Sequence, residues 1–453
     1  MGKQLIDAVP LAMQIANELD DTLQNLPEAY RPSWSLVEEL SRDADSSRLQ
    51  EAAFSQPLCT VVQVILVDIL RIAGIDFSAV VGHSSGEIGA AYAAGFLSAS
   101  DAIKIAYLRG LYASLAKGRA GEKGAMLAVG TSIEGAEELC NLPVLRGRIK
   151  LAATNSSSSV TLSGDLDAIF QAKAILDDKK QFARLLKVDT AYHSHHMQPC
   201  AEPYVRALDA VGIKIKSPSG SCIWYSSVLG GTKVEPNDTL RGTYWRDNMA
   251  NTVLFSQAIT SATNNGGPFQ MALEVGPHPA LNGPASQTLA ELGLKIPYVA
   301  TLRRGESDVR AISDCLGAIW INLGASAVDL GTAQKLLPND STPRLLKDLP
   351  SYSWDHDKPY WYESRRSKLY RSRSQPSHEL LGTRYDEGAE NEFRWRNFLS
   401  VQEIPWLEGH QIQGQTVFPA AGYVSSKLLS RFFITPLFFS SGVQKESRIA
   451  DRI

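Results

Sequence analysis

The stretch Val80-Val81-Gly82-His83-Ser84-Ser85-Gly86-Glu87 decides how the rest of the chain is interpreted. A short β-branched run leads into Gly-x-Ser-x-Gly, and a helical pattern follows. This order predicts a nucleophile elbow, in which a strand ends, the backbone turns sharply and Ser84 lies at the start of a helix. Free N–H groups at that helix end would stabilise a developing oxyanion. Taken alone, the motif also fits a surface turn that contains a serine.

The composition narrows the classes of protein to consider. The chain has 453 residues, 44% hydrophobic and 21% charged, which predicts about two to four domains. A net charge of −3 gives no general reason to bind nucleic acid or an anionic membrane. Five scattered cysteines without Cys-x-x-Cys are typical of reduced thiols. With no secretory signal and no long apolar run, we expect a cytoplasmic protein without nucleic-acid or membrane partners.

Apolar periodicity predicts helices on both sides of the elbow. Helices are expected over residues 8–28 and 33–40, and Gln56-Pro57 opens a long apolar helix that Gly74 stops. After the elbow, a further helix runs from about residue 98 to 117.

The pattern changes at Gly124. Strands and helices follow in the order β-α-β-β-α-β, which is typical of a split ferredoxin-like unit. The expected elements are strands 125–129, 150–154, 159–162 and 183–188, and helices 132–140 and 165–178. Because this unit of about 65 residues lies within an α/β pattern, we interpret it as an inserted subdomain.

The α/β pattern then resumes. Helices are expected over residues 198–211, 240–249 and 256–262, with a strand at 222–226 and a buried strand at 271–275. Alternating strands and helices predict a largely parallel sheet that is covered on both faces.

His193 is the best candidate for a general base, because it follows the last strand of the insert, where a cleft would open. With His195 and His196 it forms a group of three histidines in four residues, so a metal site is a competing interpretation. His195 and His196 are adjacent and no acidic ligand is patterned nearby, so no metal is predicted. The third interpretation is a partly buried histidine whose hydrogen bonds are satisfied within the fold and which has no catalytic role.

Arg109 follows Ser84 by 25 positions (109 − 84) on an otherwise apolar helical stretch. Such an arginine can be a surface residue or an ion-pair partner. It can also aim its fork of donors at a carboxylate. The spacing alone leaves these alternatives open.

Together these residues closely resemble the acyltransferase domain of a fungal highly reducing type I polyketide synthase, a malonyl-CoA:acyl carrier protein transacylase. The resemblance covers residues 8–300, and the linker to about 376 matches as well. The motifs that carry it are Gln56-Pro57, Gly82–Glu87, Arg109-Gly110, Asn155-Ser156 with Val160–Gly164, Tyr192-His193-Ser194 and Glu274–His278.

The resemblance implies an α/β fold with a hydrolase-like parallel-sheet core and an inserted ferredoxin-like βαββαβ subdomain. The core would comprise residues 1–122 and 190–300, and the insert residues 123–189. A post-acyltransferase linker at 301–376 and a partial hotdog (α+β) dehydratase domain at 377–453 would follow.

The same resemblance assigns roles to individual residues. Ser84 would be the acylated nucleophile and His193 its base, while Arg109 would clamp the carboxylate of a malonyl group. The remaining assignments are the Ser85 N–H for the oxyanion, Gln56 and Asn155 for the polar pocket, and Tyr192 for selecting malonyl over methylmalonyl.

The implied reaction loads a malonyl extender unit from malonyl-CoA onto the phosphopantetheine of an acyl carrier protein. No bound cofactor is expected, and the partners would be the carrier protein and other polyketide synthase domains. Two alternatives stay open, namely a serine hydrolase that uses the same elbow and a catalytically impaired synthase fragment.

The last stretch resembles the start of a hotdog dehydratase domain. The pattern His410-x3-Gly414-x4-Pro419 matches its histidine motif, in which His410 would remove an α-proton. The alternative is a helix-start histidine in a hairpin-rich domain. The partner acid lies further along in that family, and the resemblance is lost from Arg431. Residues 1–20 also lack the family's Gly-Gln-Gly turn, so we expect a chain truncated at both ends.

Overall fold

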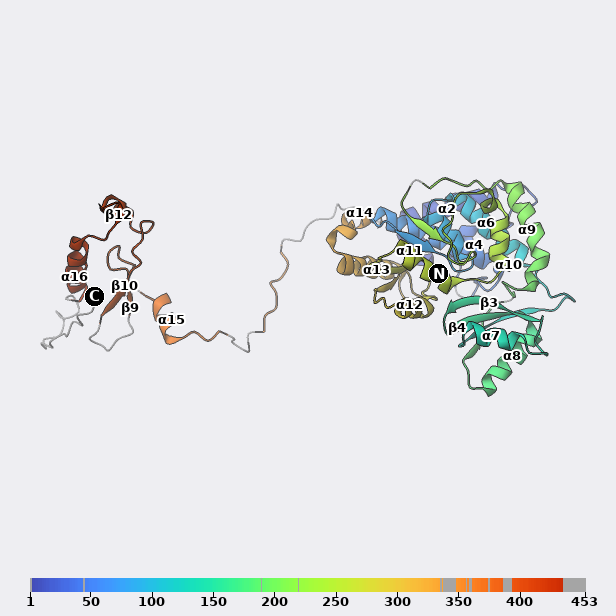
Figure 1. Ribbon diagram of the computed structural model, residues 1–453. Coiled ribbons are helices and arrows are strands. Elements are labelled where there is room, and N and C mark those ends of the chain that lie inside the picture. Colours follow the sequence, from blue (N-terminus) through green and yellow to red (C-terminus); the bar gives the residue numbers. More distant parts are fainter. Residues whose placement is uncertain are drawn as a thin grey trace. The chain divides into compact units, whose positions relative to one another are not determined.

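The chain divides into two compact units, Met1–Leu345 and Leu346–Ile453, in a computed structural model. Figure 1 shows the elements of both units. The structure describes residues 2–334 except 44, 189 and 219, together with 336, 348–355, 357, 361–373, 375–385 and 393–434.

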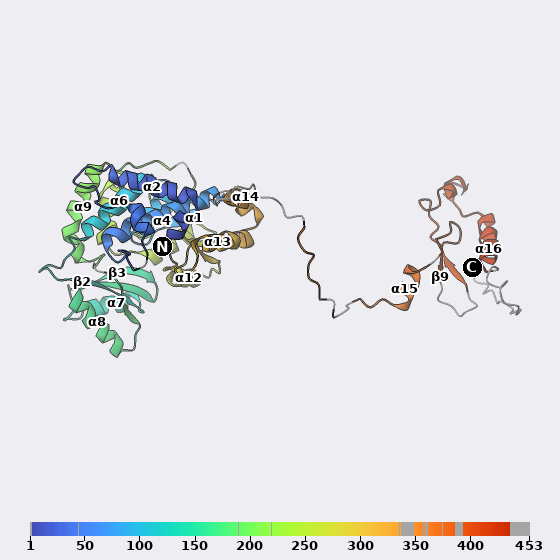
Figure 2. The same ribbon diagram turned by 180° about the vertical axis from the view of Figure 1, so that it is seen from behind.

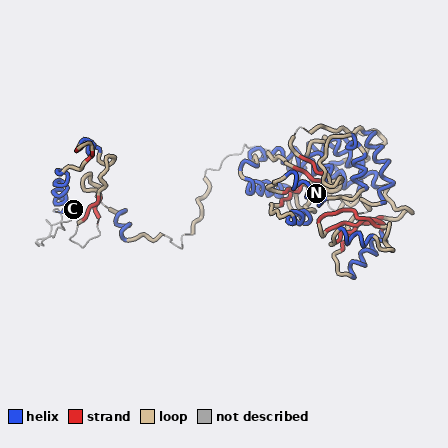
Figure 3. Tube along the Cα trace, viewed as in Figure 1, coloured by secondary structure: helices blue, strands red, loops and turns tan. Residues whose placement is uncertain are grey.

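The larger part of the first unit is built on helices that surround two short parallel strand pairs (Figures 2 and 3). Its strands are β1 Ala79–Val81, β6 Ile223–Tyr225, β7 Ala272–Glu274 and β8 Tyr298–Ala300. Its helices are α1 Lys3–Ala8, α2 Pro10–Gln24, α3 Leu36–Ser41, α4 Ala52–Ile72, α5 Gly86–Ala93, α6 Ala99–Ala113, α9 Gln198–Val211, α10 Thr243–Ala250, α11 Phe255–Gly266 and α12 Asn282–Glu291, with short 3-10 turns η1 His195–Met197 and η2 Asp238–Arg241.

The strand pairing is parallel, as predicted, but less extensive. β1 pairs with β6 and β7 pairs with β8, and the described residues show two separate pairs rather than one broad sheet. The strand at 271–275 was expected to be buried, and β7 is instead half-buried. With β8 as its one ladder partner in this part of the chain, β7 is not enclosed as a central strand would be.

Helix α4 forms the centre of the main hydrophobic core. Most of its side chains are buried, and α6 packs along it. By length and composition it could cross a membrane, but 67% of that apolar window is buried inside the fold. The prediction that Gln56-Pro57 opens this helix was wrong, because the helix begins at Ala52. A Cβ on Gly110 of α6 would lie 2.5 Å from the Ala52 carbonyl oxygen. This close packing outweighs the hydrogen bond that Pro57 cannot make.

The insert has the predicted element order. Its elements are β2 Gly124–Val129, α7 Ile133–Cys140, β3 Ile149–Ser156, β4 Ser159–Asp165, α8 Leu166–Asp178 and β5 Ala183–Leu185. The sheet order β3-β4-β2-β5 is antiparallel throughout and is the ferredoxin-like order. Helices α7 and α8 lie together against this sheet and share a separate core with it (Figure 1).

The first unit continues beyond residue 300, where a linker was expected. Helix α13 Asp308–Leu323, the turn η3 Ala325–Ala327 and helix α14 Leu330–Gln334 follow β8. Apolar side chains of α13 pack against the end of α4, and Asp308 accepts a 3.3 Å hydrogen bond from the Leu5 backbone N–H. The front of the expected linker is therefore part of the packed unit.

The second unit contains short elements. They are α15 Arg365–Arg371, β9 Thr383–Tyr385, β10 Arg394–Arg396, η4 Pro405–Gly409, β11 Gln411–Ile412, β12 Gln415–Thr416 and α16 Ala420–Ile434. Two antiparallel pairs form, β9 with β10 and β11 with β12. The resemblance to a dehydratase domain was expected to be lost from Arg431, and residues 435–453 of that stretch lie outside the described residues.

Glu87, in the first turn of α5, fixes the elbow helix to the core. Its fully buried carboxylate accepts hydrogen bonds from the Trp224 indole (2.9 Å), the Ser227 backbone N–H (3.0 Å) and hydroxyl (2.9 Å), and the Tyr244 hydroxyl (2.5 Å). Burial raises the pKa of this carboxyl above its usual value, and these hydrogen bonds oppose the rise. Four donors from beyond the insert thus converge on one side chain.

Replacing Glu87 with alanine is expected to lower the free energy of unfolding by about 3 kcal/mol, because several buried donors would lose their acceptor. Chemical denaturation measures this change. Glu87→Gln keeps the volume and one acceptor oxygen, so it should lose less. An alanine variant as stable as the parent chain would contradict the assigned role.

Candidate active site

Ser84 lies on the sharp turn between β1 and α5, as the elbow motif predicts. Its φ angle is 53°, in the left-handed region, which is strained for a residue with a side chain. A Cβ on Gly82 would lie 2.3 Å from both the Cα and the backbone nitrogen of Glu87. Glycine at position 82 therefore lets the strand pass directly beneath the start of the helix, and the turn presents Ser84.

The structure places His193 against the serine. Its Nε2 is 2.7 Å from the Ser84 Oγ, and its Nδ1 is 2.8 Å from the backbone carbonyl oxygen of Asn251. A carbonyl oxygen can only accept, so Nδ1 carries the proton and Nε2 accepts the Ser84 hydroxyl hydrogen. This is the tautomer that a general base requires, and a main-chain carbonyl holds it in place of the usual carboxylate.

His193 is also held in its neutral form. Burial, followed by the positive charge of Arg109, lowers its pKa from 6.5 to about 3. His193 is 3% exposed. A buried base that stays unprotonated at neutral pH is ready to take a proton from Ser84.

The acid limb of kcat/KM for acylation should therefore lie far below pH 6.5. The unfolded chain binds a proton at His193 below pH 6.5 while the folded chain does not. The free energy of unfolding should accordingly fall as the pH drops from 6.5 toward 3. The burst-phase acylation rate, measured from pH 8 to 5, tests where the acid limb lies. An acid limb centred near pH 6.5 would show a solvated histidine instead.

Arg109 reaches the same serine from α6. Its Nη2 donates to the Ser84 Oγ at 3.1 Å, and its Nη1 donates to the Asn248 Oδ1 at 2.5 Å. The side chain is 1% exposed, and burial lowers its pKa. Within the described part of the chain no carboxylate forms an ion pair with it, and its buried Nε has no hydrogen-bond partner. Arg109 is thus not a surface residue.

Sequence reasoning missed Asn248 on α10. Its amide bridges the site, because Nδ2 donates to the Ser84 backbone carbonyl at 2.9 Å while Oδ1 accepts from Arg109. Asn251, which orients His193, was missed as well. The signal available in the sequence was an asparagine three and four residues after Trp245 and Tyr244, on the apolar face of a predicted helix, and the structure leaves it 2% exposed.

The other predicted pocket residues have different surroundings. Asn155 lies on β3. Its Oδ1 accepts a hydrogen bond from the His83 Nε2 (2.8 Å), and its Nδ2 donates to the Thr161 hydroxyl (3.2 Å). Gln56 lies on α4, and its buried Oε1 has no hydrogen-bond partner among the described residues. The Tyr192 ring lies 5.5 Å from the Arg109 guanidinium carbon. The Ser85 N–H, next to Ser84, donates to no acceptor in the described ranges.

The second unit places His410 in a hairpin. His410 follows the turn η4, and its Nδ1 lies 2.8 Å from the backbone carbonyl oxygen of Val417, beyond β12. Gly414 has a φ of 77° between the two short strands, and Pro419 directly precedes α16. His410 therefore directly follows the end of η4 and precedes the β11–β12 hairpin, so it lies in a hairpin as the alternative expected but does not start a helix.

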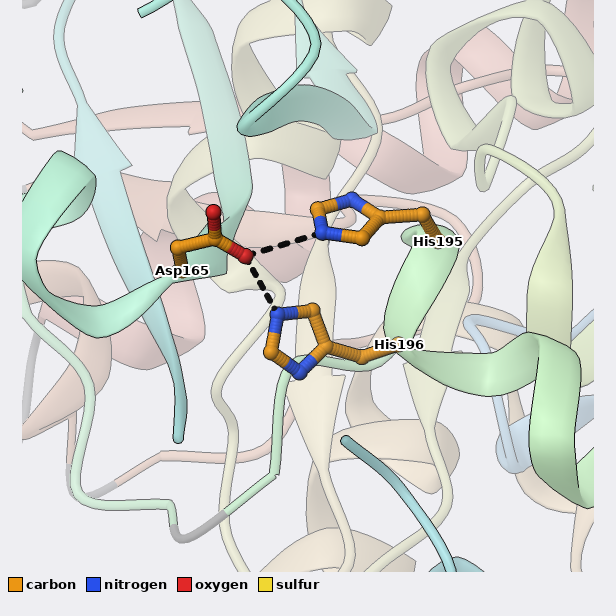
Figure 4. A group of neighbouring side chains, drawn as sticks. All are labelled: Asp165, His195 and His196. Carbon is orange, nitrogen blue, oxygen red and sulfur yellow. Dashed lines mark hydrogen bonds and ion pairs between the residues drawn. The ribbon is translucent and has the colours of Figure 1, made fainter. Parts of the chain in front are cut away.

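His195 and His196 meet a carboxylate that the sequence analysis did not foresee. Asp165, at the end of β4, lies 30 and 31 positions before them, and its Oδ1 is 2.9 Å and 2.8 Å from their Nε2 atoms (Figure 4). No acidic ligand is patterned near the two histidines in the sequence. In the fold, the antiparallel sheet of the insert brings Asp165 next to both of them.

Comparisons with known proteins identify the family of the chain. Residues 1–319 match the family described as acyl transferase domain, and residues 378–428 match the polyketide synthase dehydratase domain. The chain is 56% identical over 429 residues to the hybrid PKS-NRPS synthetase poxE of Penicillium oxalicum, covering 94% of this chain and 10% of that protein. It thus spans about a tenth of that relative's length.

Solved structures give the same answer for the fold. The acyltransferase domain from module 8 of the salinomycin polyketide synthase aligns with a TM-score of 0.63 and 29% identity, over 71% of each chain. A loading acyltransferase from the avermectin modular polyketide synthase aligns with a TM-score of 0.60 and 26% identity, over 70% of this chain and 94% of that one. The chain therefore belongs to the acyl transferase domain family of polyketide synthases and continues into the start of a dehydratase domain.

Proposed function

We propose that this acyltransferase loads a malonyl extender unit from malonyl-CoA, by way of malonyl-Ser84, onto the phosphopantetheine of an acyl carrier protein. The observation that carries the proposal is the buried Arg109 guanidinium beside the nucleophile. A buried cation with no ionised partner in the described residues is costly. An acyl group with its own carboxylate would pair with the Arg109 guanidinium and remove that cost. The pairing would also hold the thioester beside Ser84.

The first half-reaction uses the contacts of Ser84. His193 Nε2 takes the hydroxyl proton as the Ser84 Oγ attacks the thioester carbonyl. The Ser85 N–H at the start of α5 stabilises the oxyanion. When the intermediate collapses, the carbon–sulfur bond breaks and His193 returns its proton to the CoA thiol. Malonyl-Ser84 and free CoA result.

The second half-reaction repeats these steps with a different nucleophile. The phosphopantetheine thiol gives its proton to His193 and attacks the Ser84 ester. The Ser84 Oγ then leaves and takes the proton back, so the chain returns to its starting state and the kinetics are of ping-pong type.

Transfer of labelled malonyl from CoA to a holo acyl carrier protein tests this proposal against the serine hydrolase alternative. We expect the label to move to the carrier faster than it is released as free malonate. Release to water at an equal rate, with and without carrier, would favour the hydrolase.

Tyr192 should make malonyl-CoA a better substrate than methylmalonyl-CoA. Tyr192 is 9% exposed, and its ring lies beside Arg109, where a bulky group would crowd an α-methyl substituent. One methyl group in a tight site is worth about 1–3 kcal/mol, or roughly 10- to 200-fold in kcat/KM. A competition between the two CoA esters, read by mass spectrometry of acylated Ser84, measures the ratio. Equal loading of both would contradict this assignment.

A further inference from the structure

Three polar side chains meet outside the catalytic site, at the junction of the insert and the larger part of the first unit (Figure 4). The Asp165 Oδ1 is 2.8 Å from the His196 Nε2 and 2.9 Å from the His195 Nε2. A carboxylate oxygen only accepts, so both imidazoles donate from Nε2. The Asp165 Oδ2 is 3.3 Å from the Arg148 Nε. We call Asp165, His195 and His196 the junction cluster.

The junction cluster joins two separate segments. Asp165 ends β4 of the insert, whereas the histidines form η1, which begins two residues after His193. His196 is 1% exposed and Asp165 is 5% exposed. Burial raises the pKa of the Asp165 carboxyl, but the hydrogen bonds from His196 and His195 outweigh it and hold that pKa below its usual value. The cluster is therefore a buried ionised carboxylate with its donors in place.

Further hydrogen bonds fix η1 on its other sides. The Ser194 hydroxyl donates to the Ala191 carbonyl at 2.7 Å and accepts from the His196 backbone N–H at 3.2 Å. The His196 carbonyl accepts from the Lys117 N–H at 3.3 Å. A Cβ on Gly124 would lie 2.5 Å from the Ala191 Cβ and 3.1 Å from the His196 Nδ1. The segment thus has little space in which to shift.

His193 needs this support because its backbone is strained. Its φ is 61°, a left-handed conformation that a non-glycine residue keeps only where its surroundings impose it. On one side the Met249 carbonyl accepts from the His193 backbone N–H at 3.1 Å, and the Asn251 carbonyl holds the ring. On the other side the chain enters η1, which Asp165 holds.

We propose that Asp165 is a positioning residue for the catalytic base, acting through His195 and His196 to hold His193 at hydrogen-bond distance from Ser84. The insert thereby controls the alignment of the Ser84–His193 pair through the segment that contains His195 and His196. This inference rests on the proposed function only in that malonyl loading is one of its two readouts.

The same three side chains are ligand types that zinc accepts. Two observations favour a hydrogen-bonded cluster over a zinc site. The nitrogen–oxygen distances of 2.8 Å and 2.9 Å are ordinary hydrogen-bond distances. The Arg148 guanidinium also shares the Asp165 carboxylate and would repel a cation.

Asp165→Ala in the 453-residue chain tests the proposal. We expect Ser84 acylation to slow by about 10²-fold, as a displacement of about 1 Å in a catalytic group does, with the Kd of malonyl-CoA unchanged. Asp165→Asn keeps an acceptor for both imidazoles and should restore most of the rate. Asp167→Ala is the matched control, because Asp167 also pairs with Arg148 but not with the histidines, and it should keep the parent rate.

A second pair of variants guards against simple unfolding. The His195 side chain is partly exposed, so His195→Ala should stay folded and slow acylation, while His195→Gln keeps a donor near the Nε2 position and should recover the rate. Parent-like rates in both Asp165→Ala and His195→Ala would overturn the proposal. Equal losses in Asp167→Ala, or stoichiometric zinc binding that Asp165→Ala abolishes and that activity requires, would also overturn it.

A fluorophosphonate probe separates this inference from the proposed function. Labelling of Ser84 by the probe requires an aligned His193 but no malonyl group. If the parent chain does not load malonyl but Asp165→Ala still slows labelling, the proposed function is contradicted and the positioning role is supported. If the parent chain loads malonyl but Asp165→Ala labels at the parent rate, the proposed function is supported and the positioning role is contradicted.

Discussion

Replacing His193 with alanine is expected to slow the acylation of Ser84 by about 10⁴-fold, the upper end of what a general base contributes. The expectation rests on the 2.7 Å contact between Nε2 and the serine hydroxyl and on the carbonyl of Asn251, which fixes the tautomer. Without the imidazole the Ser84 hydroxyl keeps no acceptor among the described side chains, and its remaining side-chain partner there is the donor Arg109. Rapid-quench measurement of the acyl-enzyme burst with malonyl-CoA gives the rate.

The control for His193 is His83, the other histidine near the elbow. It pairs with Asn155 rather than with Ser84. His83→Ala should therefore cost far less acylation rate than His193→Ala, provided that both variants show the parent's cooperative thermal unfolding. Comparable losses in both would show that packing around the elbow, rather than proton transfer by His193, limits the rate.

Arg109→Ala is expected to lower kcat/KM for malonyl-CoA by about 10²- to 10³-fold, because truncating one partner of a buried charge pair costs roughly 2–5 kcal/mol. In the free chain Arg109 is buried beside Ser84. Removing it abolishes the attraction for the malonyl carboxylate and vacates space for a neutral acyl group. Transfer of acetyl from acetyl-CoA should therefore rise relative to malonyl.

Arg109→Lys is the matched variant for this prediction. It keeps the charge but loses the planar fork that bridges Ser84 and Asn248, so its malonyl rate should lie between those of the parent and the alanine variant. If alanine at position 109 lowered malonyl and acetyl transfer equally, Arg109 would act on Ser84 itself and not as a carboxylate clamp.

Local patterns predicted the parts of the fold whose causes are local. The β-branched run before Gly82, the helix start near residue 98 and the stop at Gly74 all lie where the sequence placed them. The order of elements in the insert followed from periodicity as well. Pro57 shows the limit of this approach, because α4 extends past it to Ala52 through packing on Gly110, which lies 58 residues away (110 − 52).

The candidate site divides in the same way. Ser84, Arg109 and His193 could be found because each lies in a recognisable motif. The carbonyl of Asn251 could not be found, since its function depends on no side chain. Asp165 escaped notice because an antiparallel strand pairing, and not proximity in sequence, brings it to His195 and His196.

The most direct test of the central assignment is intact-mass analysis of the chain after incubation with malonyl-CoA, followed by peptide mapping. We predict a mass increase of one malonyl group that maps to Ser84, is absent from Ser84→Ala and disappears when a holo acyl carrier protein is added. An unmodified chain, or an adduct that persists in Ser84→Ala, would contradict the assignment of Ser84 as the acylated nucleophile.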